Sequence, residues 1–476
     1  MSKYKRLGKN TFFVFLGNAG SKLIGFIMLP FYTKWLTVEE YGTSDNVLVY
    51  VGLLLAVVTL SISDSIFIFP KDQELEKQKQ YFSSSLTYSI LLLISTGILL
   101  FGIKEILISY NILHSITANI WYVYFLIIVI FLQTFLQQFS QSINKIKIYT
   151  ISGILLTFST ALLSFILIPK FGLDGFFAAQ IVSYLIAALY TLMHAGAYRY
   201  FSFKAIDRSR YQEMIKYSIP LIPNAVMWWL VGSLNRPLIE EYLGIYTIGL
   251  FAVAYKLPSL IIALFSVVMV SWQISVIEEH KKEDYEKFYN GVFRLVFVIL
   301  SFGVIFLSIT SKTLIGIIAA PKFIAAADYV PILSLSALFC SVSGLVGANF
   351  SATRESKYYF YSSVWGAAVA VIFNIILIPL WGLYGAVATI VLSHFVMALS
   401  RIKYSWKIVK ITNAYKYFFM IIINGFVIIS TFYIPNIVLR TVVYLVLILV
   451  FVIVNIDMKK DLKTAYLLVK SKVNKK

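Results

Sequence analysis

The chain has 476 residues, of which 59% are hydrophobic, and its mean hydropathy is +0.83. Soluble proteins contain about 45–50% apolar residues, so this composition excludes an ordinary soluble protein and predicts an all-α polytopic membrane protein. The net charge of +19 would suit nucleic acid, but the basic residues fall between apolar runs, so no nucleic-acid partner is expected. The single cysteine, Cys340, and four scattered histidines predict neither a disulfide framework nor a metal site.

Apolar runs of helical length predict fourteen spans, because a membrane span needs about 20 mostly apolar residues. The spans lie near residues 11–32, 47–69, 84–103, 119–139, 149–169, 173–195, 215–237, 247–272, 291–311, 330–350, 358–379, 383–400, 414–434 and 437–456.

The first span carries a charge near its middle. Lys22 lies there, with Asn18 one helical turn before it. A charged residue at that depth costs roughly 2.5–3.5 kcal/mol on insertion scales, and such residues usually face a polar cavity or a partner. We therefore expect this face to line a cavity, the alternative being a pair with an acid on another helix.

The distribution of Lys and Arg predicts the orientation. The side that holds the N-terminus carries 32 of the 41 basic residues, and three lie within spans. The opposite side carries six, namely Lys34, Lys104, Lys170, Lys312, Lys322 and Arg440. This asymmetry places both termini in the cytoplasm. The last residues, 458–476, alternate lysines with an apolar stripe and predict a basic amphipathic helix on the inner leaflet, or a frayed tail.

A duplication organises the chain. The segment Ile168–Ser183 (IPKFGLDGFFAAQIVS) matches Ile378–Ser393 (IPLWGLYGAVATIVLS) at an offset of 210. Near the start, Leu36–Gly42 pairs with Leu243–Gly249 at an offset of 207, which also places Pro30 on Pro237. Six spans per copy give both copies the same orientation. The predicted organisation is a lobe at 1–205, a lobe at 206–410, two further spans at 411–457 and the tail at 458–476.

Two such lobes are expected to enclose a central cleft near the bilayer midplane. The charges within the spans are Lys22, Asp64, Arg236 and Lys256. Lys22 and Lys256 come from different lobes and are the best candidates for binding one anion between the lobes. Asp64 is a candidate partner for Lys22, while Arg236 is expected to form an interfacial salt bridge with Glu240 and Glu241, one turn further on.

Amide side chains supply a second candidate lining. Gln133, Gln137, Gln141 and Asn144 form a stripe on the fourth span at spacings of four, four and three. Such a stripe would suit a hydroxyl-rich ligand such as a sugar, but amides also join helices in membranes, and both interpretations stay open. For Asn18 and Asn224, two further candidate lining residues, joining helices is the plainer interpretation.

The sequence contains no catalytic constellation. We find no nucleophile–base pair, no Gly-rich phosphate loop and no GxxxxGK[ST] motif. The chain is therefore predicted not to be an enzyme and to need no cofactor. The driving force would come from an ion gradient (Na⁺ or H⁺), the membrane potential or the substrate gradient.

The opening segment Ser21–Gly42 (SKLIGFIMLPFYTKWLTVEEYG) resembles the start of bacterial polysaccharide repeat-unit flippases. These are the Wzx-type members of the multidrug/oligosaccharidyl-lipid/polysaccharide (MOP) exporter superfamily, with a first-span Lys followed by LP-x-Y-T and EEYG. The twin-lobe plan extends the resemblance over most of the chain.

The resemblance implies a flippase of the cell membrane that moves undecaprenyl-diphosphate-linked oligosaccharides, as in O-antigen or exopolysaccharide synthesis, from the inner to the outer leaflet. It implies membrane lipid, a polysaccharide polymerase and a chain-length regulator as further partners. Lys22 matches the family's first-span basic position, and Lys256 matches, without a flanking motif, a basic position in the eighth span of related flippases.

Other functions stay open from the sequence. A cation-coupled multidrug exporter of the same superfamily would need acidic cleft residues, and here Asp64 stands alone. A membrane enzyme would need larger outer loops than this chain has. A peptidoglycan lipid-precursor flippase also fits, although the EEYG segment favours the polysaccharide branch.

Overall fold

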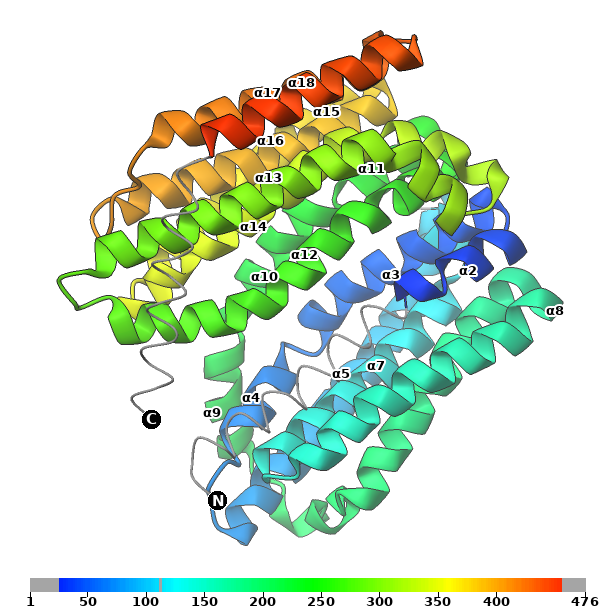
Figure 1. Ribbon diagram of the computed structural model, residues 1–476. Helices are drawn as coiled ribbons and strands as arrows, with labels where there is room; N and C mark the ends of the chain where they lie inside the picture. The colour runs from blue at the N-terminus through cyan, green and yellow to red at the C-terminus, as the bar shows by residue number, and fades with distance from the viewer. Residues whose placement is uncertain (1–24, 111–113, 456–476) are drawn as a thin grey trace. The chain divides into compact units, whose positions relative to one another are not determined.

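In the computed structural model of the protein, residues 25–110 and 114–455 are described, and their regular secondary structure is entirely helical (Figure 1). The helices are α2 (Leu29–Trp35), α3 (Val38–Val58), α4 (Ile62–Ile68), α5 (Leu75–Ser109), α6 (His114–Ala118), α7 (Ile120–Ser142), α8 (Ile146–His194), η1 (Ala197–Tyr200), η2 (Phe203–Ala205), α9 (Arg208–Ser218), α10 (Leu221–Ser233), α11 (Asn235–Leu243), α12 (Ile245–Glu279), α13 (Tyr285–Ile318), η3 (Pro321–Asp328), α14 (Val330–Ala352), α15 (Ser356–Trp381), α16 (Leu383–Ser405), α17 (Ala414–Tyr433) and α18 (Ile437–Val454).

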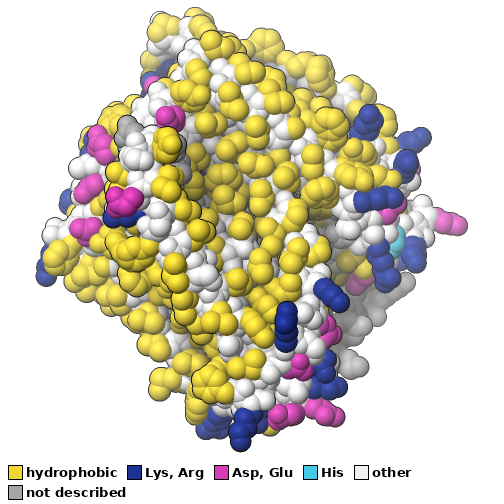
Figure 2. Space-filling view, turned by 180° about the vertical axis from the view of Figure 1, so that it is seen from behind, with side chains coloured by type: hydrophobic (Ala, Val, Ile, Leu, Met, Phe, Trp, Pro, Cys, Tyr) yellow, Lys and Arg dark blue, Asp and Glu magenta, His cyan; other side chains and the backbone are white. Residues whose placement is uncertain are grey.

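Eleven of these described helices are long and apolar enough to cross a membrane. Hydrophobic side chains cover most of the face in Figure 2, and the charged side chains gather toward its margins. That distribution is the one expected where a surface meets lipid along its middle and water at its ends. The all-α, multi-span class predicted from composition is confirmed.

The chain divides into two compact units, residues 1–252 and 253–476. In the first unit, α7 packs against α3, α4, α5 and α8, and α9 packs against α4 and α5. In the second unit, α16 packs between α14 and α15, while α13 packs on α14 and α17. The predicted lobes, 1–205 and 206–410, follow the sequence repeat and stay a prediction.

The repeat is visible in the helix boundaries. Helices α14 and α15 begin 210 residues after α7 and α8, respectively. Gly172 interrupts α8 with φ 53° and ψ −127°, and Gly382 separates α15 from α16 with φ 57° and ψ −136°. An L side chain rarely adopts these angles. The predicted spans 149–169 and 173–195 are therefore the two halves of α8, and the same helical hairpin recurs as α15–α16.

A second glycine packs each of these hairpins closely. A Cβ on Gly175 would lie 2.4 Å from the carbonyl oxygen of Leu167, and one on Gly385 would lie 2.0 Å from that of Leu377. Both contacts are with backbone atoms, which cannot move aside as a flexible side chain can. The Gly-Leu-x-Gly signature thus supplies one glycine for the turn and one for the close approach of the two helices.

Two predicted spans are not continuous helices. The span predicted at 47–69 breaks between α3 and α4, where Leu60 and Ser61 both have left-handed backbone angles (φ 51°). The span predicted at 215–237 falls on α9, α10 and α11. Pro220 follows α9 closely and Pro237 lies in the first turn of α11, positions where a missing N–H is tolerated.

Candidate functional site

Of the two residues on which the predicted cleft most depends, only Lys256 lies within the described residues. Lys22 and Asn18 lie outside the described residues. Lys256 lies in α12, half-buried, within the second unit, and its carbonyl oxygen accepts a hydrogen bond from the Ser259 hydroxyl at 2.8 Å. The pairing of Lys22 with Lys256 around one anion therefore stays a prediction.

The first unit contains a buried polar cluster that the sequence did not predict. We call it the junction cluster and define it as Asp45, Asn46, Ser115, Arg236 and Glu240. These residues come from α3, α6 and α11, so the cluster joins helices from both copies of the repeat. By the predicted topology it lies toward the outer surface.

Arg236 forms the charged centre of the junction cluster. Its Nε donates to Asp45 Oδ2 at 2.6 Å, and its guanidinium lies 5.1 Å from the centroid of the Phe251 ring. This acid comes from α3, a partner that the sequence did not predict, and the pairing of Arg236 with Glu240 and Glu241 stays a prediction. A buried ion pair holds its helices together only while both charges are present.

Glu240 is the second buried charge, only 8% exposed. Its Oε1 accepts the backbone N–H of Ser115 at 2.7 Å, and its Oε2 accepts Asn46 Nδ2 at 2.7 Å and the Ser115 hydroxyl at 3.0 Å. Three donors from α3 and α6 thus converge on one carboxylate of α11. Charge-assisted hydrogen bonds of this kind are roughly twice as strong as neutral ones.

Close backbone packing lies beside the junction cluster, about one helical turn before Asp45 and Asn46 on α3. A Cβ on Gly42 would lie 2.4 Å from the carbonyl oxygen of Ile245, and one on Gly249 would lie 2.1 Å from that of Val38. At the repeat offset of 207, Gly42 corresponds to Gly249 and Val38 to Ile245. The contact is therefore reciprocal, as expected where two copies of one motif meet about a twofold axis.

Aromatic residues complete this junction. Trp229 donates from Nε1 to the carbonyl oxygen of Val49 at 3.0 Å, and its ring lies 6.1 Å from that of Tyr50. The Tyr50 hydroxyl and the Asn46 Oδ1 are buried and have no hydrogen-bond partner among residues 25–110 and 114–455. Trp229 therefore packs between helices, and the junction retains polar atoms that another arrangement of the helices could satisfy.

The amide stripe makes contacts that join helices. Gln133 Nε2 donates to Gln137 Oε1 at 2.9 Å, and Gln137 Nε2 donates to the carbonyl oxygen of Tyr149 in α8 at 3.0 Å. Gln141 lies in the last turn of α7, and Asn144 lies beyond the end of α7 with φ 62°. The stripe is thus shorter than predicted, because the helix ends before Asn144.

The remaining predicted residues are less enclosed. Asp64 is exposed on the short helix α4, and Asn224 is half-buried in α10. Arg401 is one of the 32 basic residues assigned to the side of the N-terminus. It is fully buried in α16 and donates hydrogen bonds to Ser343 O and to Ser362 Oγ. Nothing in the hydropathy pattern distinguishes this arginine from the solvated lysines that follow it.

Sequence comparison finds curated proteins that are similar to this chain. The chain is 25% identical over 424 residues to the uncharacterized membrane protein MJ1068 of Methanocaldococcus jannaschii, a match that covers 84% of this chain and 76% of the relative. It is 26% identical over 198 residues to the capsular polysaccharide biosynthesis protein CapF of Staphylococcus aureus, covering 40% of this chain and 49% of the relative.

Solved structures share the fold. A lipid II flippase MurJ in an inward closed conformation matches with a TM-score of 0.72 at 14% identity, over 94% of this chain and 99% of that structure. An inward-facing multidrug resistance MATE family transporter of the MOP superfamily matches with a TM-score of 0.62 at 16% identity, over 83% and 94% of the two chains. The family model described as "Polysaccharide biosynthesis protein" matches residues 7–273, more than half of the chain, and the chain therefore belongs to that family.

Proposed function

We propose that this protein is a flippase that moves undecaprenyl-diphosphate-linked oligosaccharide repeat units from the inner to the outer leaflet of the cell membrane. The observation that carries the proposal is the match of residues 7–273 to the polysaccharide biosynthesis family in a chain with the MOP transporter fold. The excess of basic residues on one side of the predicted spans supports cytoplasmic termini.

The substrate assigned here carries a diphosphate, and its recognition requires cations within the membrane. Lys22 and Lys256 supply one from each lobe in this proposal. A lysine amine is a compact point charge suited to phosphate. Because a cation in the membrane interior is costly, its retention supports a role in holding an anion.

The junction cluster acts as the outer closure in this mechanism. Two buried charges tie α11 to α3 and α6, while the reciprocal glycines let the backbones meet. An anionic head group cannot leave toward the outer leaflet until such contacts separate. Binding energy from the head group and the driving gradient, Na⁺ or H⁺ among the candidates, would offset the loss of the ion pair.

The proposal can be tested in a strain that lacks this chain. We expect lipid-linked oligosaccharide to accumulate on the inner leaflet, where reagents confined to the outside cannot modify it, and the intact chain to restore accessibility. Lys256→Ala should abolish the restoration although the protein is inserted at normal levels. Lys34→Ala changes an exposed lysine that is predicted at the outer membrane surface, and this variant should still restore accessibility.

The alternatives give different outcomes in the same strain. Normal export of oligosaccharide together with internal accumulation of peptidoglycan lipid precursor would favour a precursor flippase. Normal handling of both lipids with increased sensitivity to organic cations would favour a multidrug exporter. Either result would contradict the proposed substrate.

A further inference from the structure

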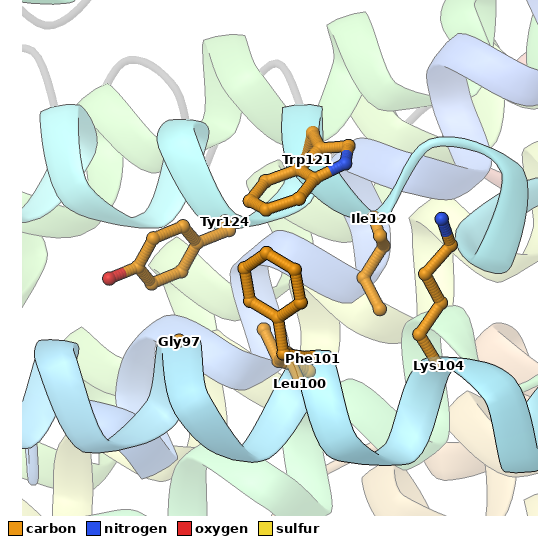
Figure 3. A pocket seen from close by; sticks show the side chains of 7 residues that line it. All are labelled: Gly97, Leu100, Phe101, Lys104, Ile120, Trp121 and Tyr124. Carbon is orange, nitrogen blue, oxygen red and sulfur yellow. The ribbon is translucent and has the colours of Figure 1, made fainter.

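A recess between α5 and α7 lies apart from the junction cluster and takes no part in the mechanism above (Figure 3). Its lining includes Gly97, Phe101 and Lys104 from α5, and Ile120, Trp121 and Tyr124 from α7. The span predictions end at 103 on α5 and begin at 119 on α7. Lys104 and Trp121 therefore lie at the same predicted membrane boundary, where lipid head groups meet the acyl chains.

The floor of the recess is closely packed. A Cβ on Gly97 would lie 2.5 Å from the Tyr124 hydroxyl, so the absence of a side chain at this position lets the Tyr124 ring lie directly over α5. The Tyr124 hydroxyl donates to the carbonyl oxygen of Leu93 at 3.2 Å. The polar group of the tyrosine is thus satisfied internally, and its ring presents an apolar surface.

The walls are aromatic and open to the surroundings. The Phe101 and Trp121 rings meet edge to face with their centroids 4.4 Å apart, yet the residues remain 58% and 41% exposed. This pairing fixes both rings without burying them. Fixed rings provide apolar contact area at little cost in conformational entropy, which suits an acyl chain lying along the recess.

One end of the recess carries two hydrogen-bond donors. Figure 3 shows the Lys104 side chain rising beside Ile120, with the indole nitrogen of Trp121 on the side of the ring nearest Lys104. Within the described part of the chain, neither the Lys104 amine nor Trp121 Nε1 has a hydrogen bond or ion-pair partner. The adjacent acid, Glu105, is exposed one residue along α5, about 100° around the helix from Lys104.

We propose that this recess binds an anionic glycerophospholipid of the outer leaflet. The lipid phosphate accepts hydrogen bonds from the Lys104 amine and the Trp121 indole, and one acyl chain lies along Phe101 and Trp121 toward Gly97. A lysine near a membrane surface contributes an attraction to anionic lipid that corresponds to about a fivefold change in affinity. The inference does not depend on the transported substrate.

The test is native mass spectrometry of the full chain, released from detergent in the presence of equal amounts of phosphatidylglycerol and phosphatidylcholine. We expect the wild type to retain phosphatidylglycerol preferentially and Lys104→Ala to reduce that retention about fivefold. Trp121→Phe keeps the ring but removes the donor, so it should reduce the preference less. Lys34→Ala, at another lysine predicted on the same side, should leave the preference unchanged.

Three results would overturn the proposal. The first is equal retention of the two lipids by the wild type. The second is an equal loss of phosphatidylglycerol in Lys34→Ala and Lys104→Ala, which would indicate general surface charge. The third is displacement of phosphatidylglycerol by an equal amount of undecaprenyl phosphate, which would assign the recess to a polyprenyl lipid instead.

Discussion

The ion pair between Asp45 and Arg236 can be tested by a double-mutant cycle. The two side chains are 18% and 6% exposed, and their closest atoms are 2.6 Å apart. Asp45→Leu leaves the guanidinium buried beside neutral acceptors, Gly232 O at 3.2 Å and Asn235 Oδ1 at 3.4 Å. Removing one partner of a buried pair typically costs about 3–5 kcal/mol, and we expect this loss of unfolding free energy.

The second single variant and the double variant determine the expected coupling energy. Arg236→Met should cost about 1–3 kcal/mol, because the remaining carboxylate of Asp45 keeps some access to water. The double variant leaves no buried charge from this pair, so its unfolding free energy should lie within about 1 kcal/mol of the wild type. The coupling energy between the two positions is then at least about 3 kcal/mol.

The measurement is unfolding of the purified chain in mixed micelles by increasing SDS, followed by circular dichroism. Lys312 and Asp328 provide a matched control, because their closest atoms are 3.7 Å apart while the side chains are 70% and 46% exposed. The same cycle there should give a coupling of about 1 kcal/mol or less. A double variant of Asp45 and Arg236 as unstable as the sum of the single variants would refute the reasoning.

Three further predictions concern other contacts of the fold. Gly385→Ala should lower the unfolding free energy by about 1–3 kcal/mol, because its Cβ would overlap backbone atoms. Gly425 has open space around it, so Gly425→Ala should leave the unfolding free energy unchanged or raise it by up to about 1 kcal/mol. Equal effects of the two variants in SDS unfolding would contradict this. Glu240→Gln should cost about 1.5–3 kcal/mol and increase the labelling of a cysteine placed at Ser115 by an external reagent, because the neutral amide loses the charge-assisted bonds; unchanged labelling would exclude a closure. Arg401→Lys should cost about 1–3 kcal/mol in the same unfolding measurement, since a lysine cannot reproduce the planar set of donors; wild-type stability would show that charge alone suffices.

The helical hairpins are the part of the fold that the sequence predicts best. The runs at 149–169 and 173–195 are separated by Gly172, and the corresponding runs of the second copy are separated by Gly382. A left-handed backbone at these positions requires glycine, so the local sequence contains the turn explicitly. For this reason the observed boundary of each hairpin falls at the residue that the repeat marks.

The interrupted helices contain backbone turns that the hydropathy pattern does not predict. The run at 47–69 is mostly apolar, so it predicts one span, yet the chain turns at Leu60 and Ser61. Neither residue type favours a left-handed conformation, and tertiary packing must hold them there. A window average over side-chain hydropathy contains no information on such a backbone turn.

The junction cluster was missed for a different reason. Arg236 and Asp45 are separated by 191 residues, while helical spacing rules connect only residues three or four apart. Those rules favoured Glu240 as the partner of Arg236. The repeat was the signal in the sequence that could have predicted the cluster, because it aligns Gly42 with Gly249. If the two copies pack against each other at these glycines, the start of α3 lies beside α11 and α12.

The charged residues of the junction cluster are not repeated in the two copies of the sequence, whereas the glycine contact beside them is. At the offset of 207, the glycines of the crossing recur, but Arg236 corresponds to Leu29, Glu240 to Thr33 and Asp45 to Ala252. These three counterparts are themselves buried, so a buried position of this fold does not require a charge there. Buried ion pairs are weak contributors to net stability compared with apolar packing. Charges placed on only one side of an otherwise reciprocal contact are therefore better explained by a contact that has to open than by the needs of folding.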